Sequence, residues 1–478
     1  MLGDEPGSMI APRMRSRGSH LRVLLGLSLA ALCGGSGCGE NSPSRVAARV
    51  LDRYRKTTGA KPLTASGMIH LRLARDGEPP ASGRDEILWA PRQYRETLTS
   101  AGMTVVHGIQ SGRAYFIDQD GVTRVASDPV LQDLRTRSYF WRRAWLFADR
   151  DGAWLELGPA DASSESLDFT PEGGNRLRLT FSRADGRLLS ARAPRFDLEF
   201  SSADAFRDVS DPATPVAAEV AWVGLPTGPI PEASAGGTSA RFEATEGAAV
   251  ERRAGAVIVP AVLSGSPIRL AIDGSEDGPV AVSPSVADRL AVKFAPDVFG
   301  RPVAPGASLS VAGATWPSLW IRRADVPAGA DAVAGGCLFR EAVVDLDLNA
   351  GRLRLLDAAS FEPPEAYFRI VIDDDGNRPV AVLNRGKKDL RLTAASDTGE
   401  AALLLAETSA RRTGYEGGVA RGLAWGPVVL PELPIAVSSQ GFFPEWGDDG
   451  RLGYPLLARF RVFVDMPHRW IYVQAVEK

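Results

Sequence analysis

The sequence is poor in the residues that usually carry metal or nucleophilic chemistry. Its 478 residues include only three cysteines and four histidines. The histidines show no metal-ligand spacing, so the sequence predicts no metal site and no other cofactor, and it argues against a Ser-His-Asp triad. Cys337 has no histidine to activate it and is expected to be a buried apolar residue. With so few cysteines, the fold must be stabilised by its hydrophobic cores.

An excess of charge of one sign and a long apolar run are also missing. Lys plus Arg is 55 and Asp plus Glu is 58, which gives a formal net charge of -3 and argues against a nucleic-acid partner. The apolar run Val23 to Leu32 is too short for a comfortable membrane span, but arginines precede it and Gly35-Ser36-Gly37-Cys38 follows it. This stretch resembles a bacterial lipoprotein signal segment, residues 1–38. The resemblance implies lipidation of Cys38 and a lipid anchor in the cell envelope, at the outer membrane or on the periplasmic face. The alternative is a secreted protein.

The most informative motif is Asp397-Thr398-Gly399, which follows an apolar-rich segment. A hydroxyl residue and a glycine after an aspartate can hold its carboxylate in a tight, hydrogen-bonded turn. Downstream, Leu452-Gly453 is an apolar-Gly pair on which such a turn could rest. With this combination, residues 365–476 resemble a retropepsin-like aspartic protease lobe. The resemblance implies a β fold with one catalytic aspartate in each lobe.

That mechanism needs two aspartates that share a proton, and an internal repeat supplies a second lobe. The segment around Ala334-Gly335 aligns with Leu452-Gly453, and Asp347 aligns with Asp465. The offset is constant, since 453 minus 335 and 465 minus 347 both give 118. Residues 246–360 are therefore predicted to form lobe 1, with Asp273 as the partner of Asp397.

Lobe 1 departs from the motif at its acid. Asp273 is followed by Gly274-Ser275, so the bracing hydroxyl is expected to be missing at the second position, and a side chain stands where the turn can require positive φ. Three hypotheses stay open: an active pair, a protease-like pair of lobes without catalysis, and pairing of two chains through their Asp397 lobes. A flap over the cleft is expected at 412–421 or at 298–310.

The N-terminal part shows strand-like alternation separated by turn residues, with helices expected at 44–56 and 129–147. Its element order resembles the half-barrel of Lol-system lipoprotein carriers over residues 44–205, which implies an apolar cup for a lipid. Aromatic residues of the second helix line this cup or fill the core, and we favour the core. Residues 206–245, rich in Pro, Gly and Ala, read as a linker.

The sequence thus predicts a mainly β protein with two tandem retropepsin-like β lobes after an antiparallel half-barrel α+β domain. The predicted function is an envelope-associated aspartic endopeptidase that hydrolyses peptide or protein substrates. The alternative is an inactive, protease-like lipoprotein that binds lipid, lipoprotein or peptide.

Overall fold

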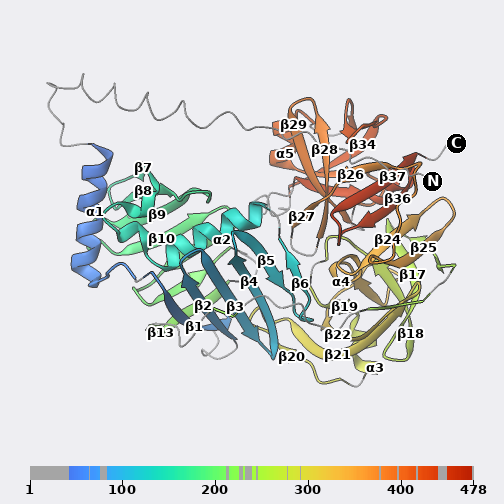
Figure 1. Cartoon of the computed structure of the whole chain (residues 1–478), viewed down its shortest axis with the longest axis horizontal. Helices are drawn as coiled ribbons and strands as arrows, with labels where there is room; N and C mark the ends of the chain where they lie inside the picture. The colour runs from blue at the N-terminus through green and yellow to red at the C-terminus, as the bar shows by residue number, and fades with distance from the viewer. Residues whose placement is uncertain are drawn as a thin grey trace, which may run out of the picture.

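The computed structural model places three β-rich units side by side, with the N-terminal domain at one end and the two lobes at the other (Figure 1). It describes residues 42–63, 65–75, 83–126, 128–210, 215–224, 230–231, 240–243, 246–253, 255–276, 278–290, 292–375, 378–395, 398–415, 418–439 and 449–475. The signal segment, Cys38 and Asp397 lie outside these residues. The predicted mainly β fold is confirmed.

The N-terminal domain is one curved sheet whose strands all pair antiparallel. Its order is β6-β5-β4-β3-β2-β1-β13-β12-β11-β10-β9-β8-β7. The strands are β1 (Gly67–Arg75), β2 (Gly83–Ala90), β3 (Gln93–Ser100), β4 (Met103–Gln110), β5 (Arg113–Ile117), β6 (Thr123–Val125), β7 (Trp154–Ala160), β8 (Ser164–Thr170), β9 (Leu177–Ser182), β10 (Leu188–Ala193), β11 (Phe196–Phe200), β12 (Ala205–Asp208) and β13 (Val216–Gly224). β13 pairs with both β1 and β12, so a strand of this sheet comes from the segment read as a linker.

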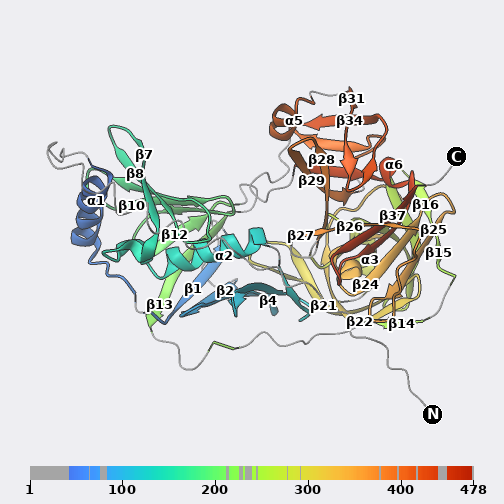
Figure 2. The same ribbon diagram turned by 45° about the horizontal axis from the view of Figure 1, so that its top comes forward.

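Two helices pack against this sheet (Figures 1 and 2). α1 (Pro43–Thr58) buries Ala47, Val50, Leu51 and Tyr54, which are spaced for one helical face, and it ends where Gly59 adopts a left-handed conformation. α2 (Asp128–Trp141) is shorter than predicted, because the chain turns at Arg143, whose φ is +52°, and continues as a 3-10 turn, Ala144–Leu146. The aromatic residues Tyr139, Phe140, Trp141 and Trp145 are buried in the domain core, as expected.

The two lobes repeat one topology. Lobe 1 contains the strand order β22-β19-β23-β18-β17, and lobe 2 contains β34-β30-β35-β29-β28. In both, the second strand of the first hairpin runs parallel to a short strand before a helix: β18 to β23 and β29 to β35. The lobe 1 strands are β17 (Ala256–Leu263), β18 (Ser266–Ile272), β19 (Val280–Val282), β22 (Ala314–Arg323) and β23 (Ala332–Ala334); those of lobe 2 are β28 (Arg378–Arg385), β29 (Lys388–Ala395), β30 (Leu403–Ala406), β34 (Leu433–Ser438) and β35 (Gly450–Gly453).

A six-stranded sheet joins the lobes. β24 (Ala342–Asp347) of lobe 1 pairs antiparallel with β36 (Phe460–Asp465) of lobe 2, with Val344 opposite Val464. β25 (Arg352–Asp357), β37 (Trp470–Ala475), β26 (Phe368–Val371) and β15 (Ala248–Ala249) complete this sheet. One hydrophobic core runs through both lobes, so the pair folds around a shared interior.

The N-terminal domain is joined to lobe 1 by a buried ionic cluster. Arg340, just after α4 (Gly336–Phe339), donates through Nη1 to Asp118 and Asp120, each at 2.7 Å. The side chains of Arg340 and Asp118 are completely buried. Asp120 also accepts from the backbone N–H of Trp320 at 2.8 Å. The domains therefore share a buried interface, and α4 is one of its anchoring points.

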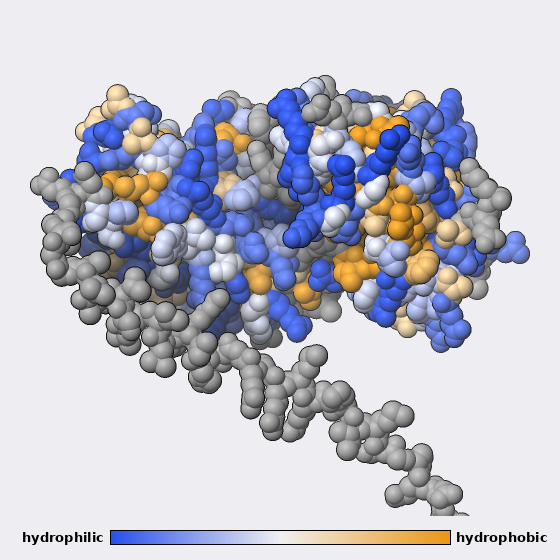
Figure 3. All heavy atoms as spheres, turned by 90° about the horizontal axis from the view of Figure 1, so that it is seen from above, coloured by the Kyte–Doolittle hydropathy of each residue, from blue (hydrophilic) through white to orange (hydrophobic). Residues whose placement is uncertain are grey.

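The surface has no single dominant apolar area on the face shown in Figure 3. Hydrophilic side chains cover much of its middle, and hydrophobic side chains gather in separate areas toward the two ends. No helix among the described residues is long and apolar enough to cross a membrane.

Candidate active site

Asp273 lies directly after β18 in a closed, hydrogen-bonded turn. Its Oδ1 accepts from the backbone N–H of Ser275 at 2.9 Å and from the Ser275 hydroxyl at 2.6 Å. Ser275 is not among the residues with positive φ. The expected loss of the brace at Gly274 is therefore compensated, because the hydroxyl comes from the third position of the motif.

Gly335 supports this turn from below, as the apolar-Gly pattern predicts. An added Cβ would lie 2.5 Å from the carbonyl oxygen of Glu276 and still closer to that of Asp273, which leaves no room for any side chain. Gly336 donates to the Glu276 carbonyl at 2.6 Å, and Asp273 donates to the Ala334 carbonyl at 3.0 Å. Close backbone packing between β18 and β23 thus sets the position of Asp273.

Lobe 2 has the corresponding support. Thr398 is buried, Gly399 has a φ of +58°, and Ala401 donates to the Thr398 carbonyl at 3.1 Å. A Cβ on Gly453 would overlap the Thr398 hydroxyl and the Ala401 carbonyl. Leu452, beside it in β35, is buried. Asp397 itself lies outside the described residues, so its role stays a prediction.

The Asp273 turn packs across the lobe interface against the strand that leads to Asp397, and a neighbouring loop of lobe 1 packs against Gly399. A Cβ built on Gly274 would lie 2.9 Å from the Ala394 carbonyl oxygen, and one on Gly255 would lie 3.0 Å from the Gly399 Cα. The Tyr454 hydroxyl, at the start of α6 (Tyr454–Leu457), donates to the Ile272 carbonyl next to Asp273. The structure therefore brings the end of the strand that leads to Asp397 against the Asp273 turn.

The strand register shows that the two acids stand at different sequence distances from the paired strands. Ile272 pairs with Ala334, and Ala394 pairs with Leu452. The residue after Ile272 is Asp273, whereas the residue after Ala394 is Ala395, opposite Gly453. Asp397 comes two residues later in the sequence (397 minus 395), so two more residues separate it from the paired strand.

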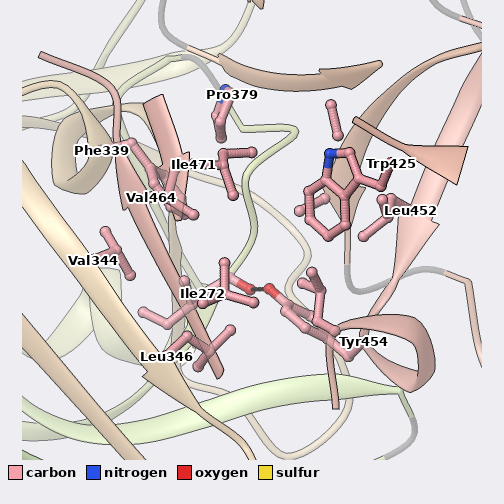
Figure 4. Close-up of a pocket in the computed structure, with 14 residues that line it drawn as sticks. Ile272, Phe339, Val344, Leu346, Pro379, Trp425, Leu452, Tyr454, Val464 and Ile471 are labelled. Atoms are coloured by element: carbon pink, nitrogen blue, oxygen red, sulfur yellow. Dashed lines mark hydrogen bonds between the residues drawn. The ribbon is translucent and has the colours of Figure 1, made fainter. Parts of the chain in front are cut away.

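Below these turns lies an apolar cavity of about 40 Å³ between the lobes (Figure 4). Ile272, Pro379, Ala394, Trp425 and Tyr454 are among the side chains that line it. Burial raises the pKa of Tyr454 well above its usual value, and the negative charge of Asp273 adds to the effect. Tyr454 therefore stays neutral and serves as a hydrogen-bond donor between the lobes.

Other side chains of the described part offer less chemistry. No group of three or more His, Cys, Asp or Glu residues there could hold a metal ion. Burial raises the pKa of the Cys337 thiol to about 12, so this cysteine is not a thiolate at neutral pH. His468 contacts Asp465 through Nδ1 at 2.9 Å, at the end of β36.

The N-terminal domain has a hollow, which we call the cup, and a cavity of about 90 Å³ remains in it. It lies between the inner face of the sheet and α2, and both apolar and charged side chains line it, including Leu71, Asp85, Glu96, Arg137, Phe206 and Asp208. Arg137 pairs with Asp133 at 2.9 Å and with Glu96 at 3.2 Å. Asp85 Oδ1 is buried without a hydrogen-bond partner. Sequence patterns missed this ionic group because its members are far apart in the chain.

Burial and the negative charge of Glu96 raise the pKa of Asp85 well above its usual range, although the positive charge of Arg137 opposes this shift. The folded protein then binds a proton that the unfolded chain loses above about pH 4. The free energy of unfolding should therefore fall as the pH rises above about 4, by about 1.4 kcal/mol per pH unit, until Asp85 ionises in the folded state. Urea unfolding from about pH 5 to about pH 8 measures this slope. Asp85→Asn should flatten it, whereas the exposed Asp288→Asn should leave it unchanged; an equal slope in Asp85→Asn would contradict the assignment.

No family model matches the sequence, and no curated protein does either. Three solved structures illustrate what the chain is similar to. A LolA superfamily protein from Nitrosomonas europaea is 9% identical, with a TM-score of 0.24 and coverage of 38% of this chain and 94% of that one. A DUF1329 family protein from Desulfovibrio piger is 11% identical, with a TM-score of 0.24 and coverage of 40% and 95%. A retropepsin-like aspartic protease from Rickettsia conorii is 13% identical, with a TM-score of 0.20 and coverage of 25% and 94%.

Proposed function

We propose that the protein is an envelope-associated aspartic-type endopeptidase in which Asp397 and Asp273 form the acid pair. The observation that carries the proposal is the contact between the Asp273 turn and lobe 2: Gly274 packs against the carbonyl of Ala394, which lies near the end of β29 and three residues before Asp397. The bracing of Asp273 by Ser275 supports it, because a catalytic carboxylate needs a fixed orientation.

The chemistry follows from two carboxyl groups that share one proton. The ionised carboxylate takes a proton from a water, whose oxygen adds to the carbonyl carbon of the peptide bond. The protonated carboxyl donates to the carbonyl oxygen. When the tetrahedral intermediate breaks down, the carboxyl that took the water proton passes it to the leaving amine, and the other carboxylate regains a proton from a hydroxyl group of the intermediate. Thr398 and Gly399 shape the Asp397 turn. Gly335 and Gly453 let the neighbouring backbone pack closely against the two turns.

Cleavage of an unfolded protein by the full chain, followed between acidic and neutral pH, tests the proposal. Asp397→Asn and Asp273→Asn should each lower kcat/KM by at least about a hundredfold, since each removes one partner of the acid–base pair. Asp288→Asn, on the surface of α3 (Pro284–Arg289), is the matched control and should cleave like the parent protein. Cleavage that survives Asp397→Asn would rule the proposal out.

A second candidate is a protease-like protein that binds peptide or lipid without cleaving. The strand register favours it, because Asp273 matches Ala395 and not Asp397. No cleavage by the parent chain, combined with saturable binding of the same unfolded protein, would support this candidate. Cleavage that starts only above a concentration at which the chain dimerises would instead support pairing of two Asp397 lobes.

We propose that the protein acts at the cell envelope and is anchored there by lipidation of Cys38. The alternative is secretion. Mass spectrometry of the N-terminal peptide of protein purified from membranes tests this. A diacylated Cys38 is expected, and an unmodified mature N-terminus elsewhere in the chain would contradict the anchor.

A further inference from the structure

One segment of lobe 1 leaves its own sheet and enters the N-terminal domain. Residues 297–301, here called the knob, connect β20 (Ala295–Pro296) to β21 (Pro302–Val311). Val298 is 1% exposed and belongs to the hydrophobic core of the N-terminal domain, and Phe299 packs against the same core. The prediction of a flap at 298–310 is therefore wrong for residues 298 and 299, which pack in the core of the N-terminal domain and not over the protease cleft.

The knob is held in shape by its own contacts. Asp297 Oδ1 accepts from the backbone N–H of Phe299 at 2.9 Å and of Arg301 at 2.8 Å, while Arg301 Nε donates to Asp297 Oδ2 at 2.8 Å. The Arg301 guanidinium lies 4.7 Å from the centre of the Phe299 ring. Because the knob is ordered by these contacts, little conformational entropy is lost when it enters the cup.

The N-terminal domain fits closely around the knob. A Cβ on Gly83, at the start of β2, would lie 3.3 Å from the Val298 Cβ. A Cβ on Gly300 would lie 2.8 Å from Arg75 Nη1 of β1. Val298 and Phe299 also form one wall of the cavity that remains in the cup. The knob thus sits in the cup as a ligand would.

The space that remains is too small for a lipid chain. It amounts to about 90 Å³, whereas ligand sites usually measure about 300–1,000 Å³. Asp85 lines this space, and one of its carboxyl oxygens, Oδ1, is buried without a hydrogen-bond partner. A larger occupant with an apolar chain and a hydrogen-bond-donating head could satisfy Asp85, but only if the knob withdraws.

We propose that the knob is an internal occupant of the cup, and that an amphiphile with an apolar chain and a hydrogen-bond-donating head competes with it. Binding of the amphiphile and seating of the knob are mutually exclusive. The consequence reaches lobe 1, because β21 continues from the knob and pairs with β17, which is the neighbour of β18, the strand directly before Asp273. The inference does not depend on the proposed proteolysis.

An engineered disulfide gives a direct test in the full chain. In Gly83→Cys/Val298→Cys the two Cβ atoms would lie close to the usual separation of about 3.5–4.5 Å in disulfides. Titration calorimetry with dodecylamine then compares the oxidised form, in which the knob is locked, with the same protein after reduction. The reduced form should bind at least about tenfold more tightly, a difference of about 1.4 kcal/mol.

Two further variants complete the experiment. Val298→Asp should loosen the knob and strengthen dodecylamine binding. Asp85→Asn in that background should reduce the preference for dodecylamine over dodecanoate without abolishing it, because Glu96 and Asp208 also line the cup. Circular dichroism checks that each variant is folded. Equal affinity of the locked and reduced forms would overturn the proposal, as would the absence of binding to folded Val298→Asp. Failure of the cysteine pair to oxidise in folded protein would contradict the seating of Val298 against Gly83.

Discussion

Replacing Arg340 with methionine should lower the free energy of unfolding by about 3–5 kcal/mol. Arg340 has a fully buried side chain and gives its Nη1 to both Asp118 and Asp120 at 2.7 Å. Methionine has a similar length but no charge, so the two carboxylates would remain buried without compensation. The cost arises from these uncompensated charges, because a complete buried ion pair contributes little net stability.

Urea unfolding of the parent protein and the variant measures the effect through the shift in midpoint. Arg421→Met is the matched control, since Arg421 pairs with Glu432 at 2.9 Å but both side chains are more than half exposed. This surface pair should contribute at most about 1 kcal/mol. A shift in Arg340→Met no larger than in Arg421→Met would contradict the assignment of Arg340 as the anchor between the domains.

The position of Arg340 also connects the N-terminal domain with the candidate site. Arg340 follows α4, which begins at Gly336, and Gly336 donates to the Glu276 carbonyl in the Asp273 turn. In the same interface, lobe 1 places its knob in the cup. The two contacts use different segments of lobe 1, so the Arg340 cluster could keep the domains together while the knob withdraws.

Much of the architecture could be predicted from local patterns. Alternating apolar residues indicated the strands, and the constant offset of 118 between Gly335 and Gly453 indicated two lobes with one topology. Local patterns could not show which distant strands pair. β13 joins β1 across about 150 residues of chain, and its sequence lies in a stretch dominated by Pro, Gly and Ala.

The candidate site was predicted in part, for a similar reason. Asp273 and the supporting glycines are recognisable because close backbone approach restricts those positions to few residue types. The hydroxyl brace was expected to be missing, because the second position of the motif is Gly274, but Ser275 at the third position donates its hydroxyl to Asp273. Nothing in the local sequence indicated that Tyr454 would donate across the interface to Ile272, since this contact depends on how the lobes pack.

Gly335→Ala should be strongly destabilising for lobe 1. The new Cβ would lie 2.5 Å from the Glu276 carbonyl oxygen and closer still to that of Asp273. Both atoms are backbone, so no side-chain rotation relieves the overlap, and β18 and β23 must separate. We expect a loss of about 3 kcal/mol in the free energy of unfolding, at the upper end of typical overpacking costs. Displacement of Asp273 by about 1 Å should also lower any proteolytic kcat/KM by about a hundredfold.

Two other glycines test this reasoning. Gly453→Ala, at the repeated position in lobe 2, should have a similar effect, because its Cβ would overlap Thr398 and Ala401. Gly278→Ala should have almost none, since a Cβ there meets nothing within 4 Å. Urea unfolding and cleavage of an unfolded protein are measured for all three. If Gly335→Ala were as stable as Gly278→Ala, the close approach of β23 to the Asp273 turn would be wrong. If it lost stability while cleavage by the folded fraction were unchanged, Gly335 would support the fold of lobe 1 without positioning a catalytic Asp273.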